Sequence, residues 1–469
     1  MSRKTLQAPF PASRSAPDAA DTARARLPDL SGRLARGRLT RRDSLWLFAA
    51  ATSGLGASGC AVSPVTGKMI PEGMSPAAER AADQQHAPHQ FSADLGAVQD
   101  PAVNGYVAGV LQRMQPHAHR KDMPYTARVL NANYVNAYTF PAGSMGITRG
   151  IMVDMKDEAQ LAALLGHEMG HVNARHTTQR QGQALFATLA LTAVAVAMGD
   201  NRWSPLVGIG AQIGASALLA RYSRDNEREA DALGQRYMVA AGYPAQGMTQ
   251  LHEMLLTEER AKPGVLETMF SSHPLSQERR DNAARQAETT YADTTGRPAG
   301  RERYMDSISS LRRIQPTIAA CQAGETAMSR KQWTEAERHL ANAIRMTPGD
   351  YAANLRMAQT QQAMGRLPEA RRYAQAARDI YPQEAQAVKL GATLKLALRD
   401  PGGALADLNA FDRLLPGDPG TVFLKGTAYE AMGQQRPAAE HFAQFLRMGA
   451  TGDAASYSQQ RLKAWGYIR

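Results

Sequence analysis

The chain has 469 residues, more than one hydrophobic core usually organises, so at least two domains are expected. Its 43% hydrophobic and 21% charged residues are ordinary for a globular protein, and many alanines with few aromatics favour helices. The net charge of +11 lies mostly in residues 1–59, which hold ten Lys and Arg against four Asp. Because the rest of the chain has no basic run, no nucleic-acid partner is expected. With only Cys60 and Cys321, no disulfide framework is expected.

Residues 1–59 have the pattern of an export signal. Arg41 and Arg42 precede a short apolar stretch, as in twin-arginine leaders, and this stretch is too short to span a bilayer core of roughly 30 Å permanently. Residues 57–60, Ala-Ser-Gly-Cys, resemble a lipobox in which the thiol of Cys60 is acylated; the alternative is cleavage without lipidation. Ala61 is not the Asp that retains lipoproteins in the inner membrane. We therefore expect a periplasmic protein anchored to the outer membrane by lipidated Cys60.

Short strands and a helix are expected in the first part of the mature chain. Residues 60–89 are rich in small, polar and Pro residues and are expected to be a linker. A helix is predicted over 100–115 and a strand over 125–130. A hairpin or edge strand is predicted over 136–148, where a Pro-Ala-Gly turn interrupts aromatic and β-branched residues.

Helices dominate the next segment. They are predicted over 156–175, 223–241, 248–260 and 276–287, and Ser223 is a suitable N-cap for the second of them. The apolar segments 184–198 and 206–220 predict a buried or surface-dipping helical hairpin. An integral membrane hairpin is the alternative.

Beyond a predicted linker at 294–316, the chain repeats itself every 34 residues. Small, aromatic and Pro residues recur in one register, in the series Ala336, Ala370, Ala404 and Ala438; Gly324, Ala358, Ala392 and Gly426; Ala343, Ala377, Phe411 and Phe445; and Pro348, Pro382 and Pro416. This period and these residue types are typical of the tetratricopeptide helix-turn-helix unit. We expect an α-solenoid of such repeats over 317–455, with a concave binding face, and a tail over 456–469.

Residues 167–171, His-Glu-Met-Gly-His, form a His-Glu-x-x-His motif on a predicted helix. Positions i and i+4 share a helix face, so His167 and His171 can bind one Zn²⁺ ion. Glu168 is offset toward the attacking water and is expected to be the general base. The five-residue pattern also occurs by chance, so its context decides.

A third ligand is expected from a second helix. Glu227 and Asp231 are i and i+4, so Glu227 can complete the zinc shell while Asp231 hydrogen-bonds a ligand imidazole. Glu229 lies on a different face and is the second choice. His176 follows the motif at the wrong offset for a metzincin ligand and is expected to be structural. Without the His motif, the acidic residues would be interpreted as a solvated helix face.

These motifs, with residues 136–150, 158–176 and 222–234, the Ser-His-Pro segment at 272–274 and Arg279, resemble the gluzincin peptidase family typified by the CAAX prenyl protease. The resemblance implies a mainly α protein, with an α+β zincin-type metallopeptidase domain and a small sheet over 90–293, followed by the repeat solenoid. It implies one Zn²⁺ per chain. His273 would then approach the metal, either as a catalytic residue that stabilises the oxyanion or as a cap on zinc in a latent state.

The resemblance also implies how substrate is bound. Members of the family add an unfolded chain to an edge strand, which would here make Asn136, Ala137, Tyr138, Gly143 and Met145 the contact residues.

The leading functional hypothesis is a zinc endopeptidase that cleaves misfolded or stalled outer-membrane and other envelope proteins. Its repeats would recruit the client or the outer-membrane assembly machinery. The alternatives are a repeat-based periplasmic chaperone or adaptor with a latent zinc site, and an integral membrane peptidase that uses residues 184–220. Glu168 argues against a purely structural zinc site, which needs four protein ligands and no adjacent base.

Overall fold

The computed structural model describes residues 60–181, 221–261 and 273–469. The chain separates into two compact units, and the second of them, residues 61–182 with 212–469, holds nearly all of the described residues. The expected export signal at 1–59 and the apolar segments within 184–220 lie outside the described part. Among the described helices, none combines the length and the apolar character needed to cross a membrane.

Three short strands form the larger sheet: β3 (Thr126–Leu130), β4 (Ala137–Thr139) and β5 (Ser144–Thr148). Their order is β3-β5-β4, with β3 parallel and β4 antiparallel to β5. The hairpin predicted over 136–148 is therefore present, and β4 is an edge strand. A second sheet pairs only β1 (Cys60–Val62) with β2 (Met69–Pro71).

Helices pack around this sheet and against one another. They are α3 (Pro76–Ala93), α4 (Pro101–Met114), α5 (Arg149–Asp154), α6 (Glu158–Asn173), α9 (Arg224–Ala240), α10 (Gln246–Ala261) and α12 (Gln277–Glu288). One hydrophobic core joins α4, β3, β5, α6 and α9, with α10 and α12 contributing to it. Ser223 caps α9 as predicted, and its hydroxyl accepts from the backbone N–H of Asn226.

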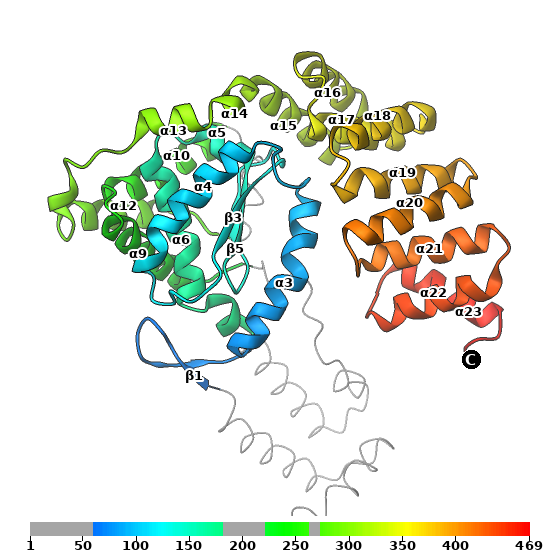
Figure 1. The fold of residues 1–469 in the computed structure, drawn as a ribbon, viewed down its shortest axis with the longest axis horizontal. Coiled ribbons are helices and arrows are strands. Elements are labelled where there is room, and N and C mark those ends of the chain that lie inside the picture. The colour runs from blue at the N-terminus through cyan, green and yellow to red at the C-terminus, as the bar shows by residue number, and fades with distance from the viewer. Residues whose placement is uncertain (1–59, 182–220, 262–272) are drawn as a thin grey trace, which may run out of the picture. The chain divides into compact units, whose positions relative to one another are not determined.

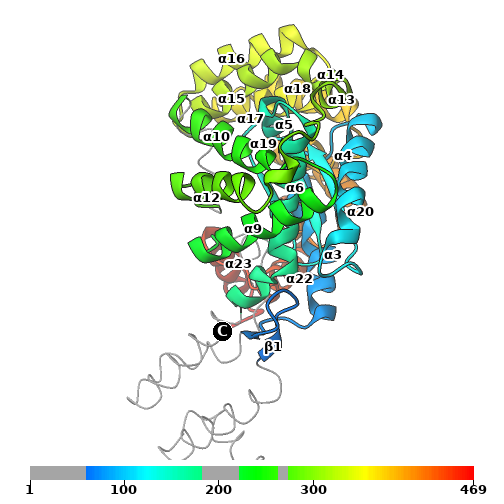
Figure 2. The ribbon, with the colours of Figure 1, turned by 90° about the vertical axis from the view of Figure 1, so that its left-hand side faces the viewer.

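Helix α6 is buried along its whole length and contacts α4, α9, α10 and β4 (Figures 1 and 2). Two glycines allow its closest contact. A Cβ on Gly166 would lie 2.7 Å from the carbonyl oxygen of Gly234, and one on Gly170 would lie 2.7 Å from that of Ala230. Because a side chain does not fit at either position, the backbones of α6 and α9 pack directly on each other.

Three segments expected to be linkers or a tail contain regular secondary structure. The expected linker 60–89 contains β1, β2 and most of α3, whose Glu79 is completely buried. The expected linker 294–316 contains α13 (Arg301–Ser307) and α14 (Ser309–Arg313), and the expected tail overlaps α23 (Asp453–Ala464). Composition was misleading here, since each of these polar helices still buries apolar side chains in a hydrophobic cluster: Phe91 in α3, Tyr304 in α13, Leu311 in α14 and Leu462 in α23.

The C-terminal part consists of paired helices that follow one another in chain order (Figure 1). The pairs are α15 (Gln315–Ser329) with α16 (Trp333–Met346), α17 (Tyr351–Ala363) with α18 (Leu367–Ile380), α19 (Ala385–Ala397) with α20 (Pro401–Leu414), and α21 (Pro419–Ala431) with α22 (Gln435–Arg447). Small residues are needed where the helices of a pair meet. A Cβ on Gly324 would lie 2.8 Å from Leu340, and one on Gly426 would lie 2.6 Å from Phe442.

Candidate metal centre

Four buried side chains meet between α6, α9 and the segment before α12. His167, His171, Glu227 and His273 each offer one ligand atom, and these atoms lie within 4.8 Å of one another. The Nε2 atoms of His167 and His171 are 3.1 Å apart, and the Nε2 of His171 is 3.3 Å from Oε1 of Glu227. Three imidazoles and one carboxylate are a donor set that suits Zn²⁺.

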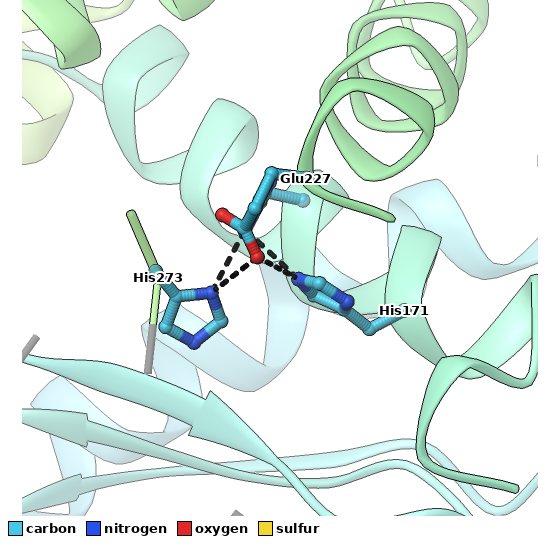
Figure 3. Close-up of side chains that lie close together, drawn as sticks. His171, Glu227 and His273 are labelled. Carbon is cyan, nitrogen blue, oxygen red and sulfur yellow. Dashed lines mark hydrogen bonds and ion pairs between the residues drawn. The ribbon is translucent and has the colours of Figure 1, made fainter. Parts of the chain in front are cut away.

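Glu227 occupies the centre of this group. Figure 3 shows its carboxylate between the rings of His171 and His273. The Nδ1 atom of His273 lies 3.2 Å from Oε1 of Glu227 and 3.3 Å from Nε2 of His167. His273 thus takes a position equivalent to that of the other three donors.

Asp231 and Arg279 hold the side chains of His167 and Glu227 in place. Oδ1 of Asp231 is 2.9 Å from Nδ1 of His167, so this imidazole presents its Nε2 atom to the cluster. The guanidinium of Arg279 donates to both oxygens of Asp231 and lies 2.6 Å from Oε2 of Glu227. Burial alone would raise the pKa of Asp231, but Arg279 holds it well below its ordinary range. The anion therefore persists inside the protein.

His171 is supported on its other side. Its Nδ1 lies 2.9 Å from Nδ1 of His176, whose Nε2 lies 3.1 Å from Glu229. The ring of Tyr222 stacks on the imidazole at 3.9 Å between centroids. Burial lowers the pKa of His171 well below its ordinary value, so the imidazole is neutral, which is the form that binds metal ions. His176 and Glu229, the residues considered less suitable as ligands, lie outside the group of four.

Glu168 is buried beside the cluster, with 1% of its surface exposed. Burial raises the pKa of its carboxyl. Its Oε1 lies 3.9 Å from Nε2 of His273, and its Oε2 has no hydrogen-bond partner among the described residues. A buried carboxylate oxygen without a partner is unusual. This free acceptor is consistent with a group that takes a proton from a small ligand at the centre.

The predicted substrate-binding residues do not all lie where strand addition requires. Hydrogen bonds join Phe140 to Ser144 and Thr148 to Asn136, so alternate residues direct their backbone groups to β5. Ala137 and Thr139 then direct theirs away from β5, at the edge of the sheet, where both residues are buried. Thr139 and Phe140 line a small depression together with His171, which places this edge beside the cluster.

Four of the predicted contact residues need correction. Asn136 exchanges hydrogen bonds with Thr148, so its backbone groups face β5. Met145 is on the central strand β5 and its side chain is fully buried in the core. The carbonyl of Gly143 accepts from Thr126, so this turn faces β3. The Tyr138 hydroxyl donates 2.5 Å to Asp94, and its ring packs against Phe91. The resemblance implied contact residues along the whole hairpin, although only its first strand lies at the edge of the sheet.

Sequence reasoning also missed two groups of the site, Tyr222 and His252. Nε2 of His252 is 3.4 Å from Oδ1 of Asp231, the same oxygen that contacts His167. Neither residue belongs to a ligand motif by spacing. The only available signal was the position of Tyr222 directly before the capped start of α9.

Comparison with known proteins agrees with both parts of the chain. Residues 101–288 match the model of peptidase family M48, and residues 327–394 match a tetratricopeptide-repeat model. The chain therefore carries an M48 metallopeptidase domain followed by tetratricopeptide repeats, in a mainly α architecture with small sheets.

Named relatives share the peptidase part. The beta-barrel assembly-enhancing protease of Escherichia coli is 26% identical over 195 residues, which are 40% of each chain. Metalloprotease YcaL of Escherichia coli is 30% identical over 156 residues, which are 33% of this chain and 59% of the relative. Mitochondrial metalloendopeptidase OMA1 of Arabidopsis thaliana is 31% identical over 165 residues, which are 34% of this chain and 31% of the relative. The match thus spans less than two thirds of each relative.

Proposed function

We propose that the protein is a zinc-dependent endopeptidase. The observation that carries the proposal is the buried group of His167, His171, Glu227 and His273, with one carboxylate oxygen of Glu168 left without a hydrogen-bond partner beside it. His167, His171 and Glu227 would hold the ion. Zinc, when bound, lowers the pKa of water and polarises a peptide carbonyl.

The side chains of this chain supply the remaining parts of such a reaction. Glu168 is placed to accept the proton of the attacking water and to pass it to the leaving amine, since its raised pKa suits a group that both takes and returns a proton. Asp231 and Arg279 keep His167 and Glu227 in place during these transfers.

The proposed substrate is an unfolded polypeptide. An extended chain that pairs with Ala137 and Thr139 of β4 would be bound by its backbone, beside the depression that Thr139 shares with His171. Such binding requires no particular sequence but does require an extended segment. Misfolded or stalled proteins supply such segments.

The proposed setting is the bacterial envelope. The expected leader and Cys60 support export and a lipid anchor at the outer membrane, and a relative named beta-barrel assembly-enhancing protease supports clients of that membrane. The repeats would recruit the client or the assembly machinery, since tetratricopeptide repeats present a concave face to other proteins.

The test is cleavage of unfolded casein by the purified protein, with and without a chelator, followed by re-addition of zinc. We expect cleavage that the chelator abolishes and zinc restores. Glu168→Gln protein purified in parallel controls for contaminating proteases. Cleavage that persists in the chelator, or that is equal in the variant, contradicts the proposal.

One observation favours a second function. His273 gives the cluster four protein donors, which is the number in structural zinc sites, and a repeat-based chaperone or adaptor with a latent zinc site would have this arrangement. A chaperone would suppress aggregation of unfolded client equally well as wild type and as Glu168→Gln, and would not cleave it. The casein assay and an aggregation assay on the same samples separate the two functions.

A further inference from the structure

A second buried polar cluster joins the peptidase part to the first repeats. Its centre is Arg149, the first residue of α5, whose side chain is 2% exposed. Its guanidinium donates from Nη1 and Nη2 to the two carboxylate oxygens of Asp350, at 2.6 and 3.1 Å. Asp350 belongs to the repeats, where it is the N-cap of α17.

The same guanidinium also holds a loop of the peptidase part. Nε and Nη2 of Arg149 donate to Oδ1 of Asn133, at 2.9 and 2.6 Å. Two repeat side chains bind the same residue, because Gln322 donates to its backbone carbonyl at 2.7 Å and Glu325 accepts from its amide at 3.2 Å. Asn133 is thus held from both sides.

This loop leads directly into the edge strand. Asn136, three residues further on, exchanges hydrogen bonds with Thr148, which is itself the N-cap of α5. The loop also lies against the helix backbone, since a Cβ on Gly150 would be 2.1 Å from the carbonyl oxygen of Asn133. Asn133 precedes β4 and Arg149 follows β5, so the cluster closes the open end of this hairpin.

We propose that Asp350 is a positioning residue for substrate binding, which it affects through Arg149 and Asn133 by fixing the position of the edge strand β4. This inference rests on the proposed function, in which β4 pairs with an unfolded chain. The first repeats would then be part of the substrate-binding apparatus of the peptidase, in addition to any client that they recruit.

The composition of the cluster supports a positioning role over a purely stabilising one. A buried ion pair contributes little to stability compared with a well-packed apolar pair, but it requires one geometry. All three nitrogens of the guanidinium are engaged, by partners from two parts of the chain. Loss of one partner of Arg149 therefore removes the geometry that fixes the loop at Asn133. Loss of a non-directional apolar contact would not do so.

Asp350→Asn isolates the charge. Asn is as good an N-cap as Asp, so the hydrogen bond that Asp350 accepts from the N–H of Ala353 can persist while the ion pair with Arg149 is lost. Asp407→Asn is the matched control, because Asp407 is equally buried but pairs only with Arg378 and Lys395 inside the repeats.

The experiment measures two quantities in the full chain: steady-state cleavage of fluorescent unfolded casein, and binding of the same casein to Glu168→Gln protein. We expect Asp350→Asn to raise KM and the dissociation constant by about tenfold, equivalent to about 1.4 kcal/mol, with kcat within twofold of wild type. Asp407→Asn should leave KM and the dissociation constant unchanged.

A double variant, Arg149→Met with Asp350→Asn, keeps the test independent of folding. The double variant lacks the buried cation that Asp350→Asn leaves unpaired, so its melting temperature should return toward that of wild type. The loop at Asn133 still lacks its hydrogen bonds to Arg149, so KM should stay high. Recovery of KM in the double variant, or a KM in Asp350→Asn equal to that of wild type, overturns the inference. Absence of zinc-dependent cleavage by wild type would instead refute the proposed function, and the binding measurement would still decide the role of Asp350.

Discussion

The candidate metal centre and the junction cluster around Arg149 are both buried and polar, but they are built differently. At the junction each nitrogen of Arg149 donates to a partner, and Asp350 is bound through both oxygens. In the metal centre three imidazoles and a carboxylate converge, and Glu168 keeps an oxygen without a partner. A cluster whose hydrogen-bonding groups are all paired holds its side chains in one position. A cluster with an unpaired acceptor leaves a place for a ligand and for proton transfer.

The largest expected effect is the loss of turnover when Glu168, the acid with an unpaired oxygen beside the candidate metal centre, is replaced. Glu168→Gln should keep zinc, because this residue is outside the group of four donors, yet lower the casein turnover by roughly 10² to 10⁴ through loss of the general base. Metal analysis and turnover are measured on the same preparation. Loss of the metal, or full activity, would show that Glu168 has another role.

The next largest effect is on zinc affinity, which distinguishes the proposed ligand Glu227 from Glu229 on the same helix. Glu227→Ala should lower the zinc affinity by more than the roughly 10- to 100-fold that loss of an outer partner costs. Glu229→Ala should lower it by no more than that amount, since this carboxylate reaches only His176. Competition with a chromogenic chelator measures both affinities, and equal retention of zinc would contradict the assignment of Glu227.

His273 decides whether the centre is closed at rest. Its Nδ1 atom lies as close to Glu227 and His167 as a fourth ligand would, so we expect it to cap the metal and His273→Ala to cleave casein several-fold faster at matched zinc occupancy. A stabiliser of the oxyanion would change the rate in the opposite direction, with a fall of about 10² or more. A variant slower than wild type therefore rejects the cap.

The sequence predicted which side chains meet in the candidate metal centre because the two motifs are local. His167 with His171 and Glu227 with Asp231 are i, i+4 pairs, and helical periodicity alone predicts that each pair shares a face. The 34-residue register of the repeats was visible for the same reason. What brings the two pairs together, the contact of Gly166 and Gly170 with α9, is tertiary packing that no local pattern encodes.

The junction could not be predicted in the same way. Arg149 and Asp350 are 201 residues apart, and neither belongs to a motif with recognisable spacing. Residues 60–89 were misjudged for a related reason. Their helix α3 is anchored by buried Glu79, which binds Arg120 and Arg175 from distant parts of the chain, so its polar composition resembles that of a linker.

The smallest expected effect is a pH dependence that differs in sign between two buried acids of the repeats. Burial opposes ionisation of Asp350, but Arg149 lowers its pKa below the ordinary value of 3.8. For Glu384, burial dominates and raises the pKa above the ordinary value of 4.5, although Ser92 and Tyr351 donate to its carboxylate. Each unit of such a shift corresponds to about 1.4 kcal/mol of stability.

The signs follow from linkage. Since the pKa of Asp350 is depressed in the folded state, its contribution is present at neutral pH and is lost as the pH falls below 3.8 through the folded value. The melting temperature of wild type should therefore exceed that of Asp350→Asn at pH 7 and converge toward it at pH 3. Since the pKa of Glu384 is raised, its contribution is present below 4.5 and is lost as the pH rises through the folded value. Wild type should thus lose stability relative to Glu384→Gln between pH 4 and pH 8. Calorimetric scans across pH 3 to 8 measure both differences, and parallel curves for wild type and Asp350→Asn would mean that the ion pair at the junction does not form in solution.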